Sequence, residues 1–479
     1  MKAEPVEVMF VINPSLWYRA MYPSGIIFLA AYLRQQGITC KIIDSALSQK
    51  RIPAKAREDL VLHAIRESKP KIVCFSASHI ELAEVVRLNK RILEIDSTVK
   101  TIAGGSQPTY RPEDFLSNGF DFVCTGEGEN TLLDFVLQAR NPRPEWTTVK
   151  GLAWKNGGKI MHNLHRELMT EPEIDNLPMP AYDLIDRRYF EINTGLIRGL
   201  PLRGAMLLTT RGCPFNCSFC GCNLIFGRRL RYKSLVKIEE EIVYLKEKFN
   251  IEGLWIIDDT FTINREHVRG VSNILKRHNI IWGCQSRANT LDEDMIKTMK
   301  QCGCKQIDIG VESGSQRVLD DIIQKKITIQ QVINAFYLAR KYHIRTLANF
   351  MIGLPTETPA ELEQTRQLAE LIRADVYVFA IATPLPGTKL YEMVGVPISP
   401  DEYCQLDWCG GPLTQKFNKS EIPDLVAAKN ALQKRFFIRS LFKSFASIDN
   451  LMFFFKRGSK LDRIKYILQY IMRAINART

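Results

Sequence analysis

The chain has 479 residues, of which 46% are hydrophobic and 24% charged. This composition is typical of a soluble globular protein of about three domains, and it excludes long disorder, collagen-like repeats and a coiled-coil rod. No apolar run approaches the roughly 18–20 residues that span a bilayer, and residues 1–7 lack the apolar core of a signal peptide. We therefore expect a cytoplasmic protein whose twelve cysteines stay reduced.

The excess positive charge is concentrated near the C-terminus. The formal net charge is +13, and residues 429–479 alone carry twelve basic and two acidic side chains. Because the rest of the chain is nearly neutral, we expect no nucleic-acid partner. The same segment is rich in Phe and Tyr. It predicts either a helix that packs on the protein through its aromatic face, or an amphipathic helix peripheral to the inner membrane face.

Residues 1–145 alternate apolar runs with helical periodicity. The runs have the length and branching of buried parallel strands, and they lie at 8–12, 41–44, 71–76, 99–103 and 120–124. Five such units predict an α/β fold with a doubly wound, Rossmann-like open sheet.

Loops rich in Gly, Ser and Pro follow four of these strands. In an open α/β sheet, such loops lie at one edge and let the backbone approach a ligand closely. They predict a binding site with these candidate residues: Asn13, Pro14, Ser76, Ala77, Ser78, Gly104, Gly105, Gln107, Gly126, Glu127, Gly128 and Glu129.

A second α/β series follows a connector at residues 146–200, which contains several prolines and a short hairpin near 152–160. Within residues 201–395, strands are predicted at 205–210, 253–258, 280–285, 306–311, 346–352 and 375–382, and helices at 237–249, 292–302, 329–342 and 360–372. Six units in succession predict a partial (β/α)6 barrel with its chemistry at the carboxyl ends of the strands. Residues 396–479 form a third, mostly helical region.

Three cysteines follow the first strand of this second series in a C-x3-C-x2-C run: Cys213, Cys217 and Cys220. Three closely spaced thiolates can hold three irons of a cubic [4Fe–4S] cluster and leave the fourth iron without a protein ligand. Zinc is the alternative, but the nearest further thiol, Cys222, lies only two residues beyond Cys220. The spacing therefore favours a cluster with one open iron.

This run, with aromatic Phe219 before its last cysteine, resembles the signature of radical S-adenosylmethionine (SAM) enzymes. Segments 309–314, 350–358 and 383–388 resemble further strand-end segments of that family. The resemblance implies that SAM binds to the open iron, and that one of Asp258 or Asp259 holds its amino group where many members have Gly-Gly-Glu. It also implies that the SAM pocket includes Phe219, Ser286, Arg287, Glu312, Ser313 and Ile352.

The front half resembles the cobalamin-binding domain fused to one large radical SAM branch, through segments 103–109 and 121–129. Relatives usually carry His where Gln107 stands. None of the seven histidines has an Asp two residues before it, so the Asp-x-His mode of cobalt ligation is excluded. The resemblance instead implies cobalamin with its base displaced and no protein His on the metal.

The resemblance implies a methyltransferase that moves a methyl group from methylcobalamin to an unactivated carbon, after hydrogen abstraction by a 5′-deoxyadenosyl radical. A cobalamin-dependent cyclase or C–C bond-forming enzyme is the alternative. A tRNA methylthiotransferase would need a second cluster on Cys40, Cys74 and Cys124, which lie in or beside apolar strands and favour packing instead. We expect an external electron donor such as flavodoxin or ferredoxin, and a small-molecule or lipid substrate.

Overall fold

The computed structural model describes residues 6–13, 22–44, 53–193, 196–197, 200, 202–399, 402, 405, 413–414 and 416–446. Pro14 and residues 447–479 of the basic segment lie outside these ranges. Within the described ranges, no helix is both long enough and apolar enough to cross a membrane.

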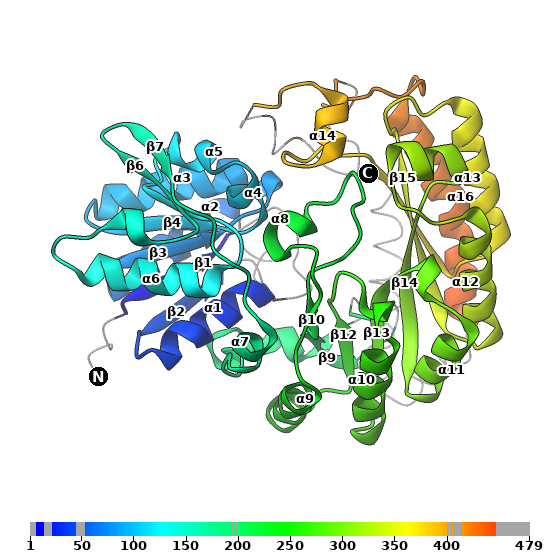
Figure 1. Ribbon diagram of the computed structural model, residues 1–479, viewed down its shortest axis with the longest axis horizontal. Helices are drawn as coiled ribbons and strands as arrows, with labels where there is room; N and C mark the ends of the chain where they lie inside the picture. The colour runs from blue at the N-terminus through cyan, green and yellow to red at the C-terminus, as the bar shows by residue number, and fades with distance from the viewer. Residues whose placement is uncertain are drawn as a thin grey trace.

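A seven-stranded sheet forms the front domain (Figure 1). Its order is β2-β1-β3-β4-β5-β6-β7, and its first five strands are parallel. All five predicted strands are present, with ends within two residues of the prediction. The order reverses between β1 and β3, the position at which open α/β sheets bind ligands. The five parallel strands are β1 (Val8–Ile12), β2 (Cys40–Asp44), β3 (Ile72–Ser76), β4 (Lys100–Gly104) and β5 (Phe122–Cys124).

Helices cover both faces of this sheet because the strands are apolar on both sides. Helices α1 and α6 share a core with Phe10, whereas α2, α3 and α5 pack on the opposite face with Met9 and Val11. The front domain is therefore doubly wound, as predicted. Its helices are α1 (Ser24–Gln35), α2 (Ala54–Ser68), α3 (Leu82–Ile95), α4 (Ser106–Tyr110), α5 (Pro112–Leu116) and α6 (Gly128–Arg140).

The hairpin predicted near 152–160 forms β6 (Leu152–Asn156) and β7 (Lys159–His162). It pairs antiparallel with β5 and so extends the front sheet, although it lies in the connector expected at 146–200. A short helix, α7 (Glu171–Asp175), follows before the chain enters the second domain.

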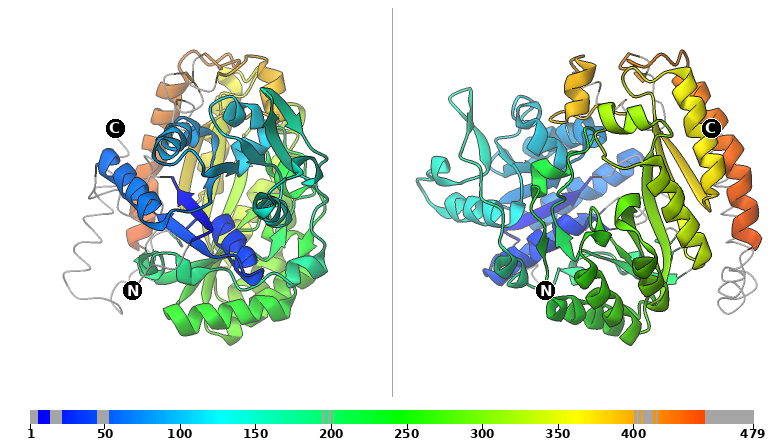
Figure 2. Two further views of the ribbon diagram at one scale, coloured as in Figure 1. Left: turned by 90° about the vertical axis from the view of Figure 1, so that its left-hand side faces the viewer. Right: turned by 45° about the vertical axis from the view of Figure 1, so that its right-hand side comes forward.

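The second domain is an open half-barrel with strand order β16-β15-β14-β13-β12-β9-β8. Six of its strands are parallel, and β8 (Ile192–Asn193) adds antiparallel to β9. Helices lie along its outer side (Figures 1 and 2). The parallel strands are β9 (Leu202–Leu207), β12 (Gly253–Ile256), β13 (Ile281–Arg287), β14 (Cys304–Glu312), β15 (Arg345–Ile352) and β16 (Val376–Ile381). The outer helices are α9 (Leu235–Phe249), α10 (Arg265–Arg277), α11 (Glu293–Gln301), α12 (Ile329–Lys341) and α13 (Pro359–Ile372).

The strand predicted at 205–210 begins and ends three residues earlier, at 202–207, and it ends there because Asp258 turns the chain away from the sheet. Its carboxylate accepts hydrogen bonds from the N–H groups of Thr209, at 2.7 Å, and Thr210, at 3.1 Å. The chain then enters a two-stranded antiparallel ribbon, and the loop that carries the three cysteines connects its two strands. These are β10 (Thr210–Arg211) and β11 (Arg231–Tyr232), and the helix within the loop is α8 (Cys222–Phe226).

The C-terminal region contains α14 (Lys389–Val394) and α16 (Leu425–Ala446), and α16 packs along β16 at the edge of the half-barrel. Gln433 donates to the carbonyl of Tyr377 and accepts from the N–H of Phe379, both at 3.1 Å. Its side-chain amide therefore makes the hydrogen bonds to β16 that a neighbouring strand would otherwise make. Phe436 is fully buried against these two rings. The first part of the basic segment therefore packs on the protein.

Candidate active site

The three predicted cluster ligands lie in the loop between β10 and β11. Gly212, immediately before Cys213, has φ +92°, and an ideal Cβ there would lie 2.3 Å from the carbonyl oxygen of Arg229. Only glycine fits such a position without a backbone shift. At the far end of the run, the N–H of Cys220 donates to the carbonyl of Cys217 at 3.1 Å. The cysteines are thus presented by a tightly turned backbone.

The chemistry of the loop fits an iron–sulfur cluster. None of the ten cysteines in the described ranges forms a disulfide. In the same ranges, no three His, Cys, Asp or Glu side chains converge on a single metal ion. A four-iron cube is larger than one ion and takes each thiolate on a separate iron, so its ligands need not converge in this way.

Arg287, at the end of β13, lies against this loop. Its Nη1 contacts the sulfur of Cys217 at 3.2 Å, and its guanidinium carbon lies 3.6 Å from the ring centroid of Phe215. A guanidinium in this position offsets the negative charge of thiolates that ligate a cluster. The predicted SAM-pocket residue Arg287 therefore also stabilises the cluster loop.

Asp258 and Asp259 differ in accessibility. Both oxygens of buried Asp258 accept hydrogen bonds, from the two N–H groups described above and from the hydroxyl of Thr209. Burial raises the pKa of Asp258 to about 6 in spite of these bonds. Asp259 is exposed on the wall of a cavity and accepts a hydrogen bond from Cys222 at 2.8 Å. Of the two carboxylates, a bound molecule can reach that of Asp259.

Glu312 ends β14 in a left-handed conformation, with φ +67°. Its carboxylate pairs with Lys325 at 2.5 Å across the face of Gly310. An ideal Cβ at Gly310 would lie 2.5 Å from both charged groups, so glycine is required for this pair. The ion pair holds the predicted SAM-contacting carboxylate at the carboxyl end of the strand.

Three further predicted SAM-pocket residues have side chains that are engaged within the protein. The hydroxyl of Ser286 lies 2.5 Å from that of Thr262. Ile352 is fully buried in the main core, and half-buried Phe219 packs against the same core. Ile352 has no exposed surface in the structure, so its side chain contributes to the core rather than to an open pocket wall.

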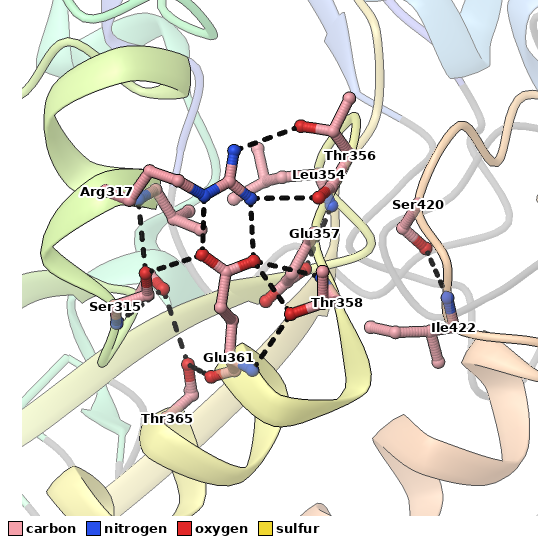
Figure 3. Close-up of polar contacts among 12 residues, drawn as sticks. Ser315, Arg317, Leu354, Thr356, Glu357, Thr358, Glu361, Thr365, Ser420 and Ile422 are labelled. Atoms are coloured by element: carbon pink, nitrogen blue, oxygen red, sulfur yellow. Dashed lines mark hydrogen bonds and ion pairs between the residues drawn. The ribbon is translucent and has the colours of Figure 1, made fainter.

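A hydrogen-bond network joins two of the predicted SAM segments (Figure 3). Glu361 accepts from Ser315 at 2.9 Å, from Arg317 at 2.7 Å through both oxygens, and from the N–H of Thr358 at 3.0 Å. The bonds from Arg317 lower the pKa of Glu361 to about 2. Ser313 is fully buried and accepts from the N–H of Ser315 at 3.1 Å, so its side chain belongs to this network.

A cavity of about 370 Å³ lies between the two domains, at the carboxyl edge of the front sheet. Its walls are mostly apolar and include Phe10, Cys74 and Ile102 from the sheet. Arg211 and Asp259 line it from the second domain. The predicted cobalamin-site residues on its wall are Ser76, Gly104, Gly105, Gly126, Glu127, Gly128 and Glu129.

Glycine backbone forms part of this wall. Gly105 has φ +106°, and an ideal Cβ there would lie 3.0 Å from the carbonyl oxygen of Ala77. Gly126 has φ +75°, with no atom within 4 Å of its ideal Cβ. Gly105 thus lets the two neighbouring loops approach each other, and Gly126 leaves the backbone open to close approach by a large ligand with an apolar macrocycle. The residues present fit cobalamin.

Three predicted cobalamin-site side chains lie off the cavity wall. Gln107 is fully buried and donates to Asp114 at 3.1 Å, so the side chain that replaces the usual His of relatives faces the front-domain core. Ser78 donates to Glu81 at 2.7 Å in a capping box, and Asn13 is buried at the end of β1. These side chains, together with the backbone of Ala77, shape the loops and do not line the cavity.

Glu127 and Glu129 line the cavity, but their carboxylates pair with arginines of the second domain. Glu127 pairs with Arg211 and Arg231, and Glu129 with Arg211. Burial alone would raise the pKa of Glu129, yet the charge and hydrogen bond of Arg211 hold that pKa below its usual value. The two carboxylates therefore connect the domains.

Arg211, Arg231 and Tyr110 also connect the domains, and this role was not predicted for them from the sequence. Tyr110, at the end of α4, lies against the cluster loop, since its hydroxyl would be 2.0 Å from an ideal Cβ on Gly221. The sequence feature that points to the arginines is the pair Glu127 and Glu129 in a glycine-rich loop, because two buried carboxylates need basic partners from elsewhere in the chain.

Comparisons with known proteins agree with both halves of the site. The B12 binding domain family matches residues 18–136, and the Radical SAM superfamily matches residues 207–369. The chain is 34% identical to an uncharacterized methyltransferase of Pyrococcus horikoshii, over 77% of this chain and 78% of that protein. The chain belongs to the cobalamin-binding radical SAM enzymes.

Two further proteins are similar to this enzyme, one in sequence and one in fold. It is 27% identical to the anaerobic magnesium-protoporphyrin IX monomethyl ester cyclase of Rubrivivax gelatinosus, over 78% of this chain and 66% of the cyclase. Its fold matches that of the radical SAM methyltransferase TsrM from Kitasatospora setae, solved with cobalamin and a [4Fe-4S] cluster bound. The TM-score is 0.67 at 16% identity, over 80% of this chain and 77% of TsrM. The family and the fold imply the same three cofactors: the cluster, SAM and cobalamin.

Proposed function

We propose that this enzyme is a methyltransferase that moves a methyl group from methylcobalamin to an unactivated carbon of its substrate. The observation that carries the proposal is the position of the cavity. Its wall combines the glycine loops of the front domain with Asp259 and Arg211, which flank the cluster loop. A corrin held there would lie beside the site at which SAM is cleaved, as transfer of a methyl group to a carbon radical requires.

When bound, the cluster supplies the electron that cleaves SAM, and cobalamin supplies the methyl group. Cys213, Cys217 and Cys220 would hold the cluster, with Arg287 offsetting its charge. The accessible carboxylate of Asp259 would hold the amino group of SAM. Glu312 would orient the ribose from its fixed position over β14.

We also propose that cobalamin binds with its base displaced and without a protein ligand on cobalt. Two observations support this. The described residues that line the cavity include no histidine, and Gln107 is turned into the core beside Asp114. Absorbance spectra of the bound cob(II)alamin distinguish this state from one with a nitrogen ligand.

A cyclase that forms a C–C bond without methyl transfer is the second candidate, favoured by the 27% identity to the magnesium-protoporphyrin cyclase. By contrast, Cys74 and Cys124 are buried, and burial raises the pKa of Cys124 to about 12. Cys74 and Cys124 pack in the hydrophobic core of the front domain, a setting that does not suit the second cluster that a methylthiotransferase needs.

Anaerobic reconstitution with iron, sulfide, hydroxocobalamin, SAM and a reductant tests the proposal. Bound cobalamin is measured by absorbance, and 5′-deoxyadenosine and S-adenosylhomocysteine are quantified together. Equal amounts of both products support methyl transfer, whereas 5′-deoxyadenosine alone supports the cyclase. Protein that binds zinc but no cluster, or that binds no corrin, contradicts both candidates.

Replacing Cys217 with Ala gives a sharper test of the cluster assignment. We expect the Cys217→Ala variant to lose both cluster absorbance and 5′-deoxyadenosine formation. Cys222→Ala is the matched control, because Cys222 lies in the same loop but bonds to Asp259. It should keep its iron, and equal iron loss in both variants would contradict the ligand set.

We further propose that flavodoxin or ferredoxin reduces the cluster, and that the basic C-terminal segment brings the enzyme to a membrane with a lipid substrate. Sedimentation with anionic liposomes tests the second point. The truncated control should end after Ala446, because a cut near Lys429 would remove the Phe436 contact with the barrel. If the full and truncated chains sediment equally, the membrane proposal is wrong.

A further inference from the structure

Two buried arginines face each other across the ribbon that bounds the cluster loop. Arg211 of β10 and Arg231 of β11 are directly paired in the antiparallel register, and their side chains are 5% and 3% exposed. Like charges at directly opposed positions repel each other, and in the protein interior this repulsion is poorly screened. The ribbon therefore needs a compensating negative charge to form.

The front domain supplies this charge. One oxygen of Glu127 accepts from Arg211 at 3.1 Å and from Arg231 at 2.9 Å, and its other oxygen accepts from the N–H of Met169 at 2.8 Å. Glu129 accepts from the other terminal nitrogen of Arg211 at 2.5 Å. A single carboxylate thus holds both ends of the loop that carries the three cysteines.

The same carboxylates belong to the loop that lines the cavity. Glu127 and Glu129 flank Gly128, and all three residues are on the cavity wall, as is Arg211. The guanidinium of Arg211 also lies about 6 Å from the rings of Phe28 in α1 and Phe226 in α8, one from each domain. A shift of the cavity loop must therefore move the cluster loop.

These ion pairs are better suited to fixing the relative position of the two loops than to stabilising the fold. Removing four charges from water is costly, and buried ion pairs often stabilise a fold no more than apolar residues of the same size. Their geometry, by contrast, is strict. Arg211 makes directional bonds to two carboxylates, which lysine with its single nitrogen cannot reproduce.

We infer that Glu127, Glu129, Arg211 and Arg231 form an ionic clamp that fixes the position of the cluster loop relative to the cobalamin loop. These are positioning residues, and they act on the reaction only through the two loops that they join. The inference rests on the proposed function, because it requires that the two loops hold the cluster and cobalamin.

The test measures the separation of the two cofactors in the reconstituted enzyme. A reduced cluster and cob(II)alamin are both paramagnetic, so their spin–spin interaction reports this separation without turnover. We expect the spin–spin coupling of the wild type to show a narrow distribution of strengths, which indicates one separation. In Glu127→Gln we expect a broader distribution, with both cofactors still bound. We also expect methyl transfer per 5′-deoxyadenosine to fall roughly 100-fold, the effect of a displacement of about 1 Å at a reacting centre.

Asp183→Asn is the matched control, since it breaks an exposed ion pair between the connector and Arg34 of α1. It should leave the spin–spin interaction unchanged. If Glu127→Gln does not fold, the double variant Arg211→Gln with Glu129→Gln removes one charge of each sign and should fold with a broadened interaction. A narrow, unchanged interaction in either clamp variant overturns the inference. A wild type that shows the narrow interaction but converts no SAM to S-adenosylhomocysteine contradicts the proposed function and leaves the clamp standing.

Discussion

Phe436→Ala tests how the C-terminal helix is attached to the catalytic domain. The Phe436 ring is fully buried, with its centroid 4.6 Å from that of Tyr377 and 5.5 Å from that of Phe379. Both partners lie on β16, whose free edge is covered by α16. Truncation to alanine removes the ring contacts and leaves a cavity on this edge.

The expected loss follows from this burial. Phe→Ala substitutions in cores destabilise by about 3–5 kcal/mol. For a unit of about 200 residues, each kcal/mol lowers the unfolding midpoint by about 2–4 °C. We therefore expect the midpoint of the second domain to fall by roughly 6–20 °C. Phe437, which is only half-buried on the same helix, should give less than half of this shift when changed to alanine.

Differential scanning calorimetry of the two variants provides the measurement, and limited proteolysis reports whether α16 is released. If Phe436→Ala and Phe437→Ala shift the midpoint equally, or if neither shifts it, then α16 is not docked through Phe436. In that case the aromatic face of the segment would be available to a membrane along its whole length.

Three further predictions concern Gly212, Gly310 and Glu361. Gly212→Ala should lose most of its bound iron, because its Cβ would meet the carbonyl of Arg229 at 2.3 Å and the positive φ alone costs about 1–3 kcal/mol. Gly310→Ala should keep its iron but lose the SAM-induced change in the electron paramagnetic resonance spectrum, because its Cβ would displace the ion pair over β14. The pKa of Glu361, held at about 2 by Arg317, predicts stability that is present above pH 4.5 and lost as the pH falls toward 2. Urea unfolding of the wild type and of Glu361→Gln should therefore differ at pH 6 and converge as the pH falls.

Each of these predictions has an outcome that contradicts it. Gly157→Ala, in the exposed β6–β7 turn with open space around its ideal Cβ, is the control for Gly212→Ala and should keep its iron. An intact SAM response in Gly310→Ala would show that the Glu312 pair does not organise the SAM pocket. A constant difference between the wild type and Glu361→Gln from pH 6 to pH 3 would exclude the Arg317 contact as a source of stability.

Local pattern was sufficient to predict the positions of most elements. All five front strands and all six parallel strands of the half-barrel overlap the apolar runs that predicted them. The half-barrel strand that differed most ends early because Asp258, 49 residues away in the chain, binds the backbone of Thr209. A side chain distant in sequence thus set a boundary that propensity within the strand could not predict.

Some residues of the candidate site could be predicted from the sequence, and others could not. The C-x3-C-x2-C spacing was sufficient to predict Cys213, Cys217 and Cys220 as cluster ligands, because ligands within one short loop need no distant partner. It could not distinguish Asp258 from Asp259, since only tertiary packing buries one and exposes the other. Similarly, Gln107 lies in a ligand-binding loop by sequence but turns toward Asp114 in the fold.

Two α/β domains, the cysteine loop and the glycine loops could be predicted from the sequence, because period, branching and short-range spacing are local properties of the chain. Which polar groups stay available to ligands, and which join the domains, depends on tertiary packing. Glu127 and Glu129 show the reason: a buried carboxylate must be paired, and its partners lie more than 80 residues away, on a ribbon of the other domain.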